Sequence, residues 1–494
     1  MRLKNAFVVV VAAISSAFAQ QQTNSSASSL RTCTILQTRL GSEVIQFPGG
    51  PEYLASASNA WSLFNAESLP TCIVFPRETV HVQVAMAAIF RDKIHYAVQA
   101  GGHSAMTGWN TLQDGILFFF SHMQNVTYDA VKDTITLQPG IHWGDALTQL
   151  QPLGVAPMGG RLGDIGTGLL LGGGLNYLSG IHGFSSDSYV ELDVVLVTGK
   201  LVTATATNEH ADLFRALKGG ANRFGIVTRY EVQAVHTGTN DDKILFGGLI
   251  LYPNSSAEAL IQATQKYVST INDPRASILM AFSATLNNSV ISPSHILTLF
   301  YNGTSLPQNI FGDFLSIPST FTQVGAMSYV EANNILGSGG TRGFGQLFGA
   351  SAFNGSVDQY MNAFSQWNKY TSTIAGALSG TVLAFTPIQQ SQIAAGRARG
   401  FNIMDPPLTN YAAVQIQSQF APGLLDTSPA VEAARQTFLS SIPRSPGLPL
   451  YINECDAGQN VFSTYTRYDE LRNTYAKYDP TRFNVRFTQG PIGL

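Results

Sequence analysis

A histidine inside a glycine turn is the first candidate for chemistry in this chain. Residues 98–109 read VQAGGHSAMTGW, so Gly101 and Gly102 lead directly into His103, and Gly108 follows five residues later. A neutral imidazole can act as a nucleophile or a base near pH 7. Glycine adopts positive φ angles and lets a ligand approach the backbone closely. By residue type alone, His103 would more commonly be a hydrogen-bonded turn residue, so the surrounding sequence has to decide its role.

A second glycine-rich segment follows at residues 159–183, where ten of 25 residues are glycine. It is not a dinucleotide-binding fingerprint, because the glycine required after Gly166 and Gly168 is replaced by Leu171. The chain has no GxxxxGKS/T phosphate loop, and GHSAM ends on Met106 where a nucleophile elbow needs glycine. The nine histidines show no HExxH spacing, so no zinc site is predicted.

The elements around the first glycine turn indicate how it is positioned. The sequence predicts a buried strand at 72–75, an amphipathic helix at 78–90, and a strand at 94–100 that ends on the turn. Such a unit can point backbone N–H groups at a phosphate. Downstream, a hairpin is predicted at 191–206, and a helix at 211–218 is followed by a strand at 225–235.

Beyond residue 238 the pattern changes to that of a second α+β domain. Strands are predicted at 244–251 and 294–301, with a helix at 255–271 between them. Charged residues make up only 12% of the chain, and the formal net charge is −3. This composition argues against nucleic acid or an anionic membrane as a partner.

The N-terminus predicts entry into the secretory pathway. Arg2 and Lys4 precede the apolar run AFVVVVAAI, and AFA at 17–19 forms a cleavage pattern, so residues 1–19 are expected to be a signal peptide. The alternative is a buried N-terminal helix, and no membrane span is predicted. Sequons that fit N-glycosylation lie at Asn24, Asn125, Asn254, Asn287, Asn302 and Asn354.

The three cysteines predict one disulfide and one free thiol. Cys33 and Cys72 both precede the glycine-rich region, and a bond between them would join the N-terminal segment to its domain. Cys455 is then expected to be a buried free thiol.

Five ordered blocks of the chain resemble the vanillyl-alcohol oxidase / p-cresol methylhydroxylase superfamily, and within it the berberine-bridge-enzyme-like oxidases. The blocks are LPTCIVFPRETVHVQ, QAGGHSAMTGW, the segment 159–187, DLFRALKGGANRFGIVTRYEV and the terminal YINE…KYDPTRF. The resemblance implies an α+β fold, in which a two-part FAD-binding domain joins a substrate domain whose antiparallel sheet roofs the flavin. The expected organisation is a signal peptide (1–19), an N-terminal segment (20–65), the FAD domain (66–238), the substrate domain (239–448) and a returning C-terminal segment (449–494).

The resemblance also implies which residues hold the cofactor. His103 would carry FAD covalently through the methyl group at flavin C8. Backbone amides of Gly101, Gly102, Ser104 and Gly108 would hold the pyrophosphate. The remaining flavin contacts are expected from Gly160, Arg161, Gly163, Gly166, Gly168, Gly225, Ile226 and Val227.

Two departures from the family pattern bear on function. Many relatives attach the flavin a second time through a cysteine, but this chain has Leu162 near that position and no cysteine between residues 73 and 454, so a single attachment is predicted. The terminal motif reads YINE, which places Glu454 where relatives commonly have an aromatic residue.

The resemblance implies transfer of a hydride from a C–H bond beside a hydroxyl or amine to flavin N5, with dioxygen as acceptor. A base is expected from the sheet of the second domain, and the candidates are Tyr451 and Glu454. A carboxylate buried there would have a raised pKa, which suits a base. Alternatively, Tyr451 packs in the core and Glu454 binds a backbone amide.

Three functions remain open from sequence. The first is an oxidase that tailors a small organic secondary metabolite, and the second is an extracellular carbohydrate or alcohol oxidase. The third is a flavoprotein without catalytic activity, against which the intact glycine turns and His103 argue.

Overall fold

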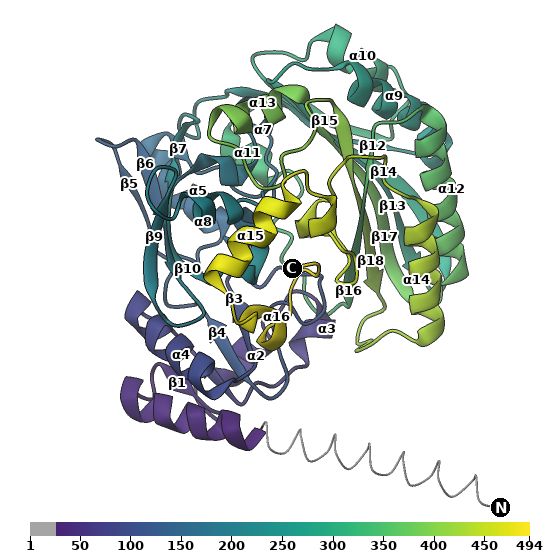
Figure 1. Cartoon of the computed structure of the whole chain (residues 1–494). Helices are drawn as coiled ribbons and strands as arrows, with labels where there is room; N and C mark the ends of the chain where they lie inside the picture. Colours follow the sequence, from purple (N-terminus) through teal and green to yellow (C-terminus); the bar gives the residue numbers. More distant parts are fainter. Residues whose placement is uncertain (1–25) are drawn as a thin grey trace, which may run out of the picture.

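The computed structural model describes residues 26–494, so the predicted signal peptide and Asn24 lie outside the described residues. Two sheet-containing halves lie side by side, with the C-terminal segment crossing the first of them (Figure 1). This mixed α and β architecture confirms the predicted fold class. Within residues 26–494, no helix is both long and apolar enough to cross a bilayer.

The first half begins with a four-stranded sheet in the order β1-β2-β4-β3, in which β2, β4 and β3 are parallel. Its elements are β1 (Ile45–Gln46), β2 (Cys72–Val74), α4 (Thr79–Asp92), β3 (Tyr96–Gln99) and β4 (Ile116–Phe119). Strand β2 is apolar and buried along its whole length, as expected for a parallel strand covered on both faces. Helix α4 buries Val82, Met86 and Ile89 and ends at Lys93, whose φ of 56° stops it. The predicted strand–helix–strand unit before the glycine turn is thereby confirmed.

A five-stranded antiparallel sheet follows, in the order β5-β6-β10-β8-β9. Its strands are β5 (Val126–Asp129), β6 (Thr134–Leu137), β8 (Tyr189–Val195), β9 (Leu201–Thr205) and β10 (Ile226–Gln233). Strands β8 and β9 pair as the predicted hairpin, and helix α8 (Ala211–Ala216) lies where a helix was expected. The smaller elements of this half are α2 (Tyr53–Ala57), α3 (Leu63–Ala66), α5 (Trp143–Leu150), β7 (Val155–Ala156), α6 (Gly168–Leu171), α7 (Ser179–His182) and β11 (Val235–His236).

The N-terminal segment is fastened to the four-stranded sheet. Residues 26–40 are helical, and Cys33 in this helix forms a disulfide with Cys72 at the start of β2. Both cysteines are fully buried in one apolar cluster. Cys455 is free and buried. The predicted cysteine pairing is therefore confirmed.

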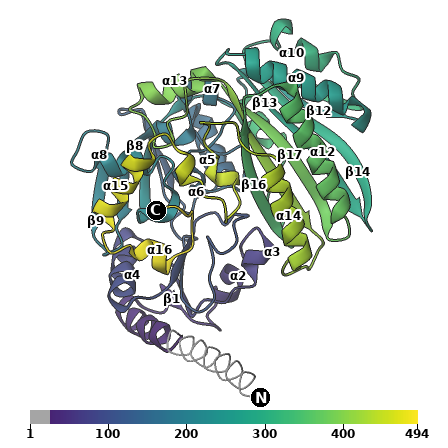
Figure 2. The same cartoon turned by 45° about the vertical axis from the view of Figure 1, so that its right-hand side comes forward.

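The second half is built on a seven-stranded antiparallel sheet in the order β15-β12-β14-β13-β17-β18-β16. Its strands are β12 (Leu245–Tyr252), β13 (Ala276–Asn287), β14 (Val290–Asn302), β15 (Phe321–Met327), β16 (Gln346–Phe353), β17 (Leu378–Ile388) and β18 (Tyr411–Phe420). Its helices are α9 (Ala257–Thr270), α10 (Gln308–Leu315), α11 (Tyr329–Asn334), α12 (Val357–Thr373), α13 (Gln390–Ala398) and α14 (Pro429–Ser441). Helices α9, α10, α12 and α14 cover the outer face of this sheet (Figures 1 and 2).

Successive side chains along each strand of the seven-stranded sheet point to opposite faces of the sheet, as the pleat requires. On β13, Met280 and Phe282 pack in the core beneath the helices, whereas Leu279 and Ala281 face the first half of the chain. The same alternation recurs on the neighbouring strands. One face of the sheet is thus a conventional core, and the other is available to close a cavity.

The chain finally returns to the first half through α15 (Tyr468–Tyr478) and α16 (Phe483–Phe487), drawn in yellow in Figure 1. The buried guanidinium of Arg223 holds this return in place. It donates to the backbone carbonyls of Asn484, Thr488 and Pro491 at 2.9 to 3.0 Å. The short turn Ile452–Glu454, earlier in this returning segment, forms part of the cavity described next.

Candidate active site

A cavity of about 510 Å³ lies between the two glycine-rich segments and the inner face of the seven-stranded sheet. Its wall includes the glycine turn at 100–104 and the segment 161–169, both predicted to meet the cofactor. The start of β10 and the C-terminal residues 451–454 complete it. Segments from four separate parts of the sequence therefore converge on one site.

The two glycine-rich segments touch through their backbones. A Cβ atom built on Gly101 would lie 2.7 Å from the backbone nitrogen and 2.8 Å from the Cα of Gly166, and the reverse contact is equally close. Gly102 has a φ of +80°, which an L side chain rarely adopts. Only glycine fits these positions, so the backbone itself lines this part of the cavity. Such a surface suits a cofactor whose phosphates bind backbone N–H groups.

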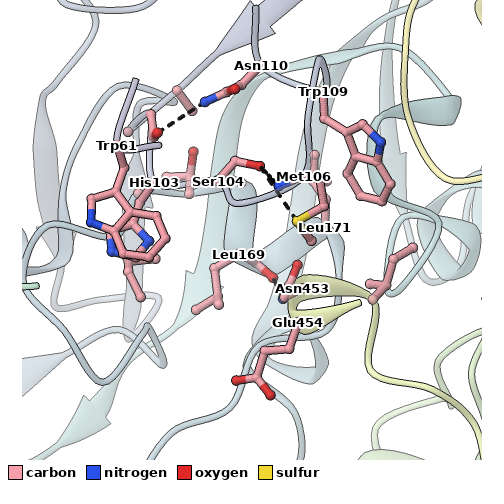
Figure 3. Close-up of a pocket in the computed structure, with 18 of the residues that line it drawn as sticks. Trp61, His103, Ser104, Met106, Trp109, Asn110, Leu169, Leu171, Asn453 and Glu454 are labelled. Atoms are coloured by element: carbon pink, nitrogen blue, oxygen red, sulfur yellow. Dashed lines mark hydrogen bonds between the residues drawn. The ribbon is translucent and has the colours of Figure 1, made fainter. Parts of the chain in front are cut away.

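His103 lies on the cavity wall and is held by two contacts. Its Nε2 atom is 3.3 Å from the carbonyl oxygen of Gly339, and its ring lies against the indole of Trp61 (Figure 3). Burial lowers the pKa of His103 to about 4, although Asp164 opposes that shift. The imidazole is therefore neutral at physiological pH.

The start of β10 supplies three further wall residues, Gly225, Ile226 and Val227. Gly225 has a φ of +133°, and a Cβ there would lie 2.4 Å from the carbonyl oxygen of Val195. Asn222, just before this strand, also lines the cavity, and its Nδ2 donates to the carbonyl oxygen of Gln489 at 2.8 Å.

Three of the predicted cofactor contacts lie outside the cavity. The N–H of Gly108 donates to Asn65 Oδ1 at 2.8 Å, so it is already engaged. Gly160 packs against Trp143, and Gly163 against Gly144. These three glycines allow close packing of the loops. The other predicted contacts line the cavity, namely Gly101, Gly102, His103, Ser104, Arg161, Gly166, Gly168, Gly225, Ile226 and Val227.

Glu454 is the one carboxylate on the described wall of this cavity. Its Oε1 lies 3.6 Å from Nη2 of Arg161, and both side chains are largely buried. Burial raises the pKa of Glu454, and the Arg161 charge counteracts this shift. Tyr451 also lines the cavity, and its hydroxyl accepts a hydrogen bond from Asn453 Nδ2 at 3.0 Å. Burial raises the pKa of Tyr451 well above its ordinary value.

Tyr451 and Glu454 were expected on the sheet of the second domain, and this placement was wrong. Tyr451 and Glu454 lie in the short 3₁₀ turn that follows the sheet, because the chain leaves the sheet before reaching the cavity again. The sheet itself presents no ionisable side chain to the described cavity. Its lining residues are Leu279, Ala281, Ile296, Thr298, Phe348, Val382, Ala384, Gln415 and Gln417.

Sequence reasoning missed several wall residues that tertiary structure brings in. Trp61 and Trp109 come from different loops of the first half, and Thr298 from the middle of β14. Thr298 is fully buried. Only the strand alternation of SHILTLFY could have suggested that Thr298 faces away from Leu297 and Leu299, and it does not reveal which face meets the cofactor.

Comparisons with known proteins agree with this geometry. The FAD binding domain family matches residues 70–205, which include both glycine-rich segments. An FAD-linked oxidoreductase of Arthroderma benhamiae is 30% identical over 469 residues, covering 89% of this chain and 90% of that protein. The chain belongs to the FAD-linked oxidoreductases. An FAD-dependent monooxygenase of Arthrobotrys oligospora is 29% identical over 464 residues, covering 91% and 87% of the two chains.

Solved structures share the fold of this FAD-linked oxidoreductase at low sequence identity. The glucooligosaccharide oxidase of Acremonium strictum, described with a 6-S-cysteinyl, 8α-N1-histidyl FAD, superposes with a TM-score of 0.75 at 19% identity. The superposition covers 94% of this chain and 100% of the glucooligosaccharide oxidase chain. The carbohydrate oxidase of Microdochium nivale gives a TM-score of 0.74 at 19% identity, with the same coverage.

The FAD of this oxidoreductase would meet the glycine turn, the segment 161–169 and the start of β10. Leu162, expected at the position of the second attachment, lines the same cavity. Leu162 and His103 both lie close to Gly339, because a Cβ on that glycine would be 2.8 Å from Leu162 Cδ1 and 3.5 Å from His103 Nε2. An isobutyl side chain has no atom that can form a thioether.

Proposed function

We propose that this FAD-linked oxidoreductase is a secreted oxidase that carries FAD on His103 alone and oxidises an uncharged, largely apolar small molecule. The observation that carries the proposal is a neutral His103 on the wall of a cavity that the sheet closes without a charge. Bound FAD would supply a hydride acceptor at N5 and return the electrons to dioxygen.

The hydrogen bond to Gly339 supports attachment through His103 Nδ1. A carbonyl oxygen only accepts, so the Nε2 atom 3.3 Å away must carry the proton. In a neutral imidazole the lone pair then lies on Nδ1. Leu162 supports a single attachment, because no cysteine lines the described wall of the cavity.

Glu454 is the base that the wall best supports. Desolvation raises its pKa toward the pH at which a carboxylate can accept a proton from a substrate hydroxyl or amine. Arg161 would keep the carboxylate ionised and, by donating to Thr386 Oγ1 at 3.2 Å, is itself held against the sheet. Tyr451 is the weaker candidate, since its raised pKa keeps the phenol protonated.

The inner face of the seven-stranded sheet, which closes the cavity as a roof, favours an apolar substrate rather than an oligosaccharide. The register places Ile296, Ala281 and Ala384 side by side across three strands, which forms an apolar strip. Thr298 adds a buried polar side chain at one end of the roof, and Gln415 supplies an amide on the strand beside Ala384. Sugars carry hydroxyls along their whole length, and an apolar strip would leave those groups unpaired. This favours tailoring of a secondary metabolite over oxidation of carbohydrate.

Secretion is supported by the buried Cys33–Cys72 disulfide and by the exposure of the sequons. Asn125, Asn254, Asn287 and Asn354 are exposed, and Asn302 is partly exposed. Disulfides persist in oxidising compartments, where N-glycans are also added.

The decisive experiment is acid precipitation of the secreted protein and of His103→Ala. We expect the yellow colour to remain with the wild-type pellet and to be released from the variant. Treatment with an N-glycosidase should lower the mass of the secreted chain. Peroxide release is then measured with a panel of neutral aromatic alcohols and with oligosaccharides of glucose. Wild-type protein that releases all its FAD contradicts the tether, and turnover of the sugars alone contradicts the proposed substrate.

A further inference from the structure

The indole of Trp61 lies almost parallel to the imidazole of His103. The ring centroids are 4.1 Å apart, and the planes meet at 15°. The two rings overlie one another in Figure 3, away from Asn453 and Glu454. Trp61 is 6% exposed and lies outside residues 70–205, which match the FAD binding domain. One face of the proposed attachment residue is thus covered by a side chain from the N-terminal segment.

A short strap, residues 59–63, holds Trp61 between the two halves of the molecule. The N–H of Trp61 donates to the carbonyl oxygen of Gly102 at 3.0 Å, which ties the strap to the glycine turn. The hydroxyl of Ser62 accepts from the N–H of Gln346 at 2.9 Å and lies 3.1 Å from the carbonyl oxygen of the same residue. The strap is therefore fixed to both the turn and strand β16, so the indole is held independently of His103.

The stack matters because the lone pair of an imidazole nitrogen lies in the plane of the ring. Rotation about the Cβ–Cγ bond of His103 would swing that lone pair away from its target. The bond to Gly339 is long at 3.3 Å and restrains only one edge of the ring. A flat partner on one face restrains the plane itself.

We propose that Trp61 is a positioning residue that orients His103 for its covalent attachment to FAD, an inference that rests on the tether proposed above. In the attachment, a C–N bond forms between Nδ1 and the methyl carbon at flavin C8. One methyl C–H and the imidazole N–H are lost as two protons. The two electrons released pass to the flavin and then, with two protons, to dioxygen, which gives hydrogen peroxide. Trp61 takes no part in the bond changes, and its effect is on the direction of the Nδ1 lone pair.

If Trp61 orients His103, its replacement should lower the rate at which FAD becomes covalently attached, and this rate can be measured. Purified full-length apoprotein is mixed with FAD in air, and acid-stable flavin per chain is followed with time. Total bound flavin is measured in parallel by absorbance of the native protein after gel filtration. We expect Trp61→Ala to form the covalent bond about tenfold or more slowly, while it still binds FAD reversibly. Trp61→Phe keeps a flat ring and is expected to stay within about threefold of wild type.

Two controls separate orientation from general loosening. Trp61→Leu restores apolar volume without a flat ring, so it should remain slow if the stack is what matters. Trp367→Phe alters a fully buried tryptophan in the core beneath the helices of the second half, and the covalent rate should not change.

The outcomes distinguish this inference from the proposed tether. Wild type that never forms acid-stable flavin contradicts the tether at His103. If wild type forms it and Trp61→Ala forms it at the same rate, the tether stands and the role of Trp61 is wrong. Equal slowing in Trp61→Phe and Trp61→Ala would likewise overturn the stacking role.

Discussion

Arg161 and Glu454 form an ion pair on the cavity wall, although the two residues are almost 300 positions apart in the chain. Arg161 belongs to the second glycine-rich segment, and Glu454 to the turn that follows the second half. The pair therefore places a carboxylate of raised pKa beside a segment expected to line the flavin. The first prediction concerns this carboxylate.

Replacement of Glu454 by Gln should lower kcat by about 10²- to 10⁴-fold, the usual contribution of a general base. Glu454 must be ionised to accept a proton. Wild-type kcat is therefore expected to fall as the pH is lowered through the raised pKa of this carboxyl group. Glu454→Gln should lack this acidic limb and should keep its FAD. Tyr451→Phe serves as the comparison. A pH–rate profile that loses its limb in Tyr451→Phe instead would assign the base to the tyrosine.

Replacement of Gly101 by Ala should disrupt the contact between the two glycine-rich segments. The new methyl group would meet the backbone nitrogen of Gly166 at 2.7 Å, and backbone cannot move aside as a flexible side chain can. We expect a loss of about 1–3 kcal/mol in the free energy of unfolding and weaker binding of FAD. Gly325→Ala is the matched control, because nothing lies within 4 Å of the added Cβ. Unchanged FAD content in Gly101→Ala would show that the segments do not have to touch.

Replacement of His295 by Leu should raise stability at acid pH. His295 is fully buried, 4.9 Å from the ring of Phe282, and neither ring nitrogen has a partner within the described residues. Burial lowers the pKa of His295 to about 4, below its value in the unfolded chain. The unfolded chain therefore binds the proton first, and this contribution to stability is complete above about pH 6.5 and declines toward pH 4.

Chemical denaturation at several pH values measures this effect. Between pH 6.5 and 4, wild type should lose up to about 1.4 kcal/mol per pH unit more than His295→Leu does. The comparison with the variant removes the contributions of His103 and His182, whose pKa values burial also lowers. Identical slopes in the two proteins would show that His295 is not neutral and buried in the folded chain.

The disulfide should be needed for a stable N-terminal segment. Cys33→Ser with Cys72→Ser opens a link across 39 residues, and we expect a loss of about 2–5 kcal/mol in the free energy of unfolding. The predicted pairing also determines how many reactive thiols each chain should contain. Denaturation without reductant should expose one reactive thiol per chain, that of Cys455, and denaturation with reductant should expose three. Three thiols without reductant would mean that the bond is absent.

Much of the first half follows from local sequence. The strand, helix and strand before the glycine turn, the hairpin of β8 and β9, and the partnership of Cys33 with Cys72 all agree with the structure. The strands and helices depend on near neighbours in the chain, because apolar periodicity sets the element and glycine ends it. The cysteine pairing followed instead from the order of only three cysteines in the chain.

The arrangement of the site could not be obtained in this way. Period-two alternation shows that β14 has two faces, but only packing against the helices decides that Leu297 lies in the core and Thr298 faces the cavity. Gly108, Gly160 and Gly163 were predicted as cofactor contacts but do not line this cavity, and local sequence could not show what approaches each glycine.

The sequence by itself determined that a strand ends on a glycine turn that carries His103, because apolar periodicity and glycine are local signals. The cofactor role of His103 is a prediction from the family resemblance. The tertiary structure alone decided what surrounds that histidine. Trp61, 42 positions earlier, covers its face, and the carbonyl of Gly339, 236 positions later, binds its Nε2. These contacts form where the strap and the loop of Gly339 come together in space. They are stabilised by the packing of the two halves, so no periodic pattern in the local sequence predicts them.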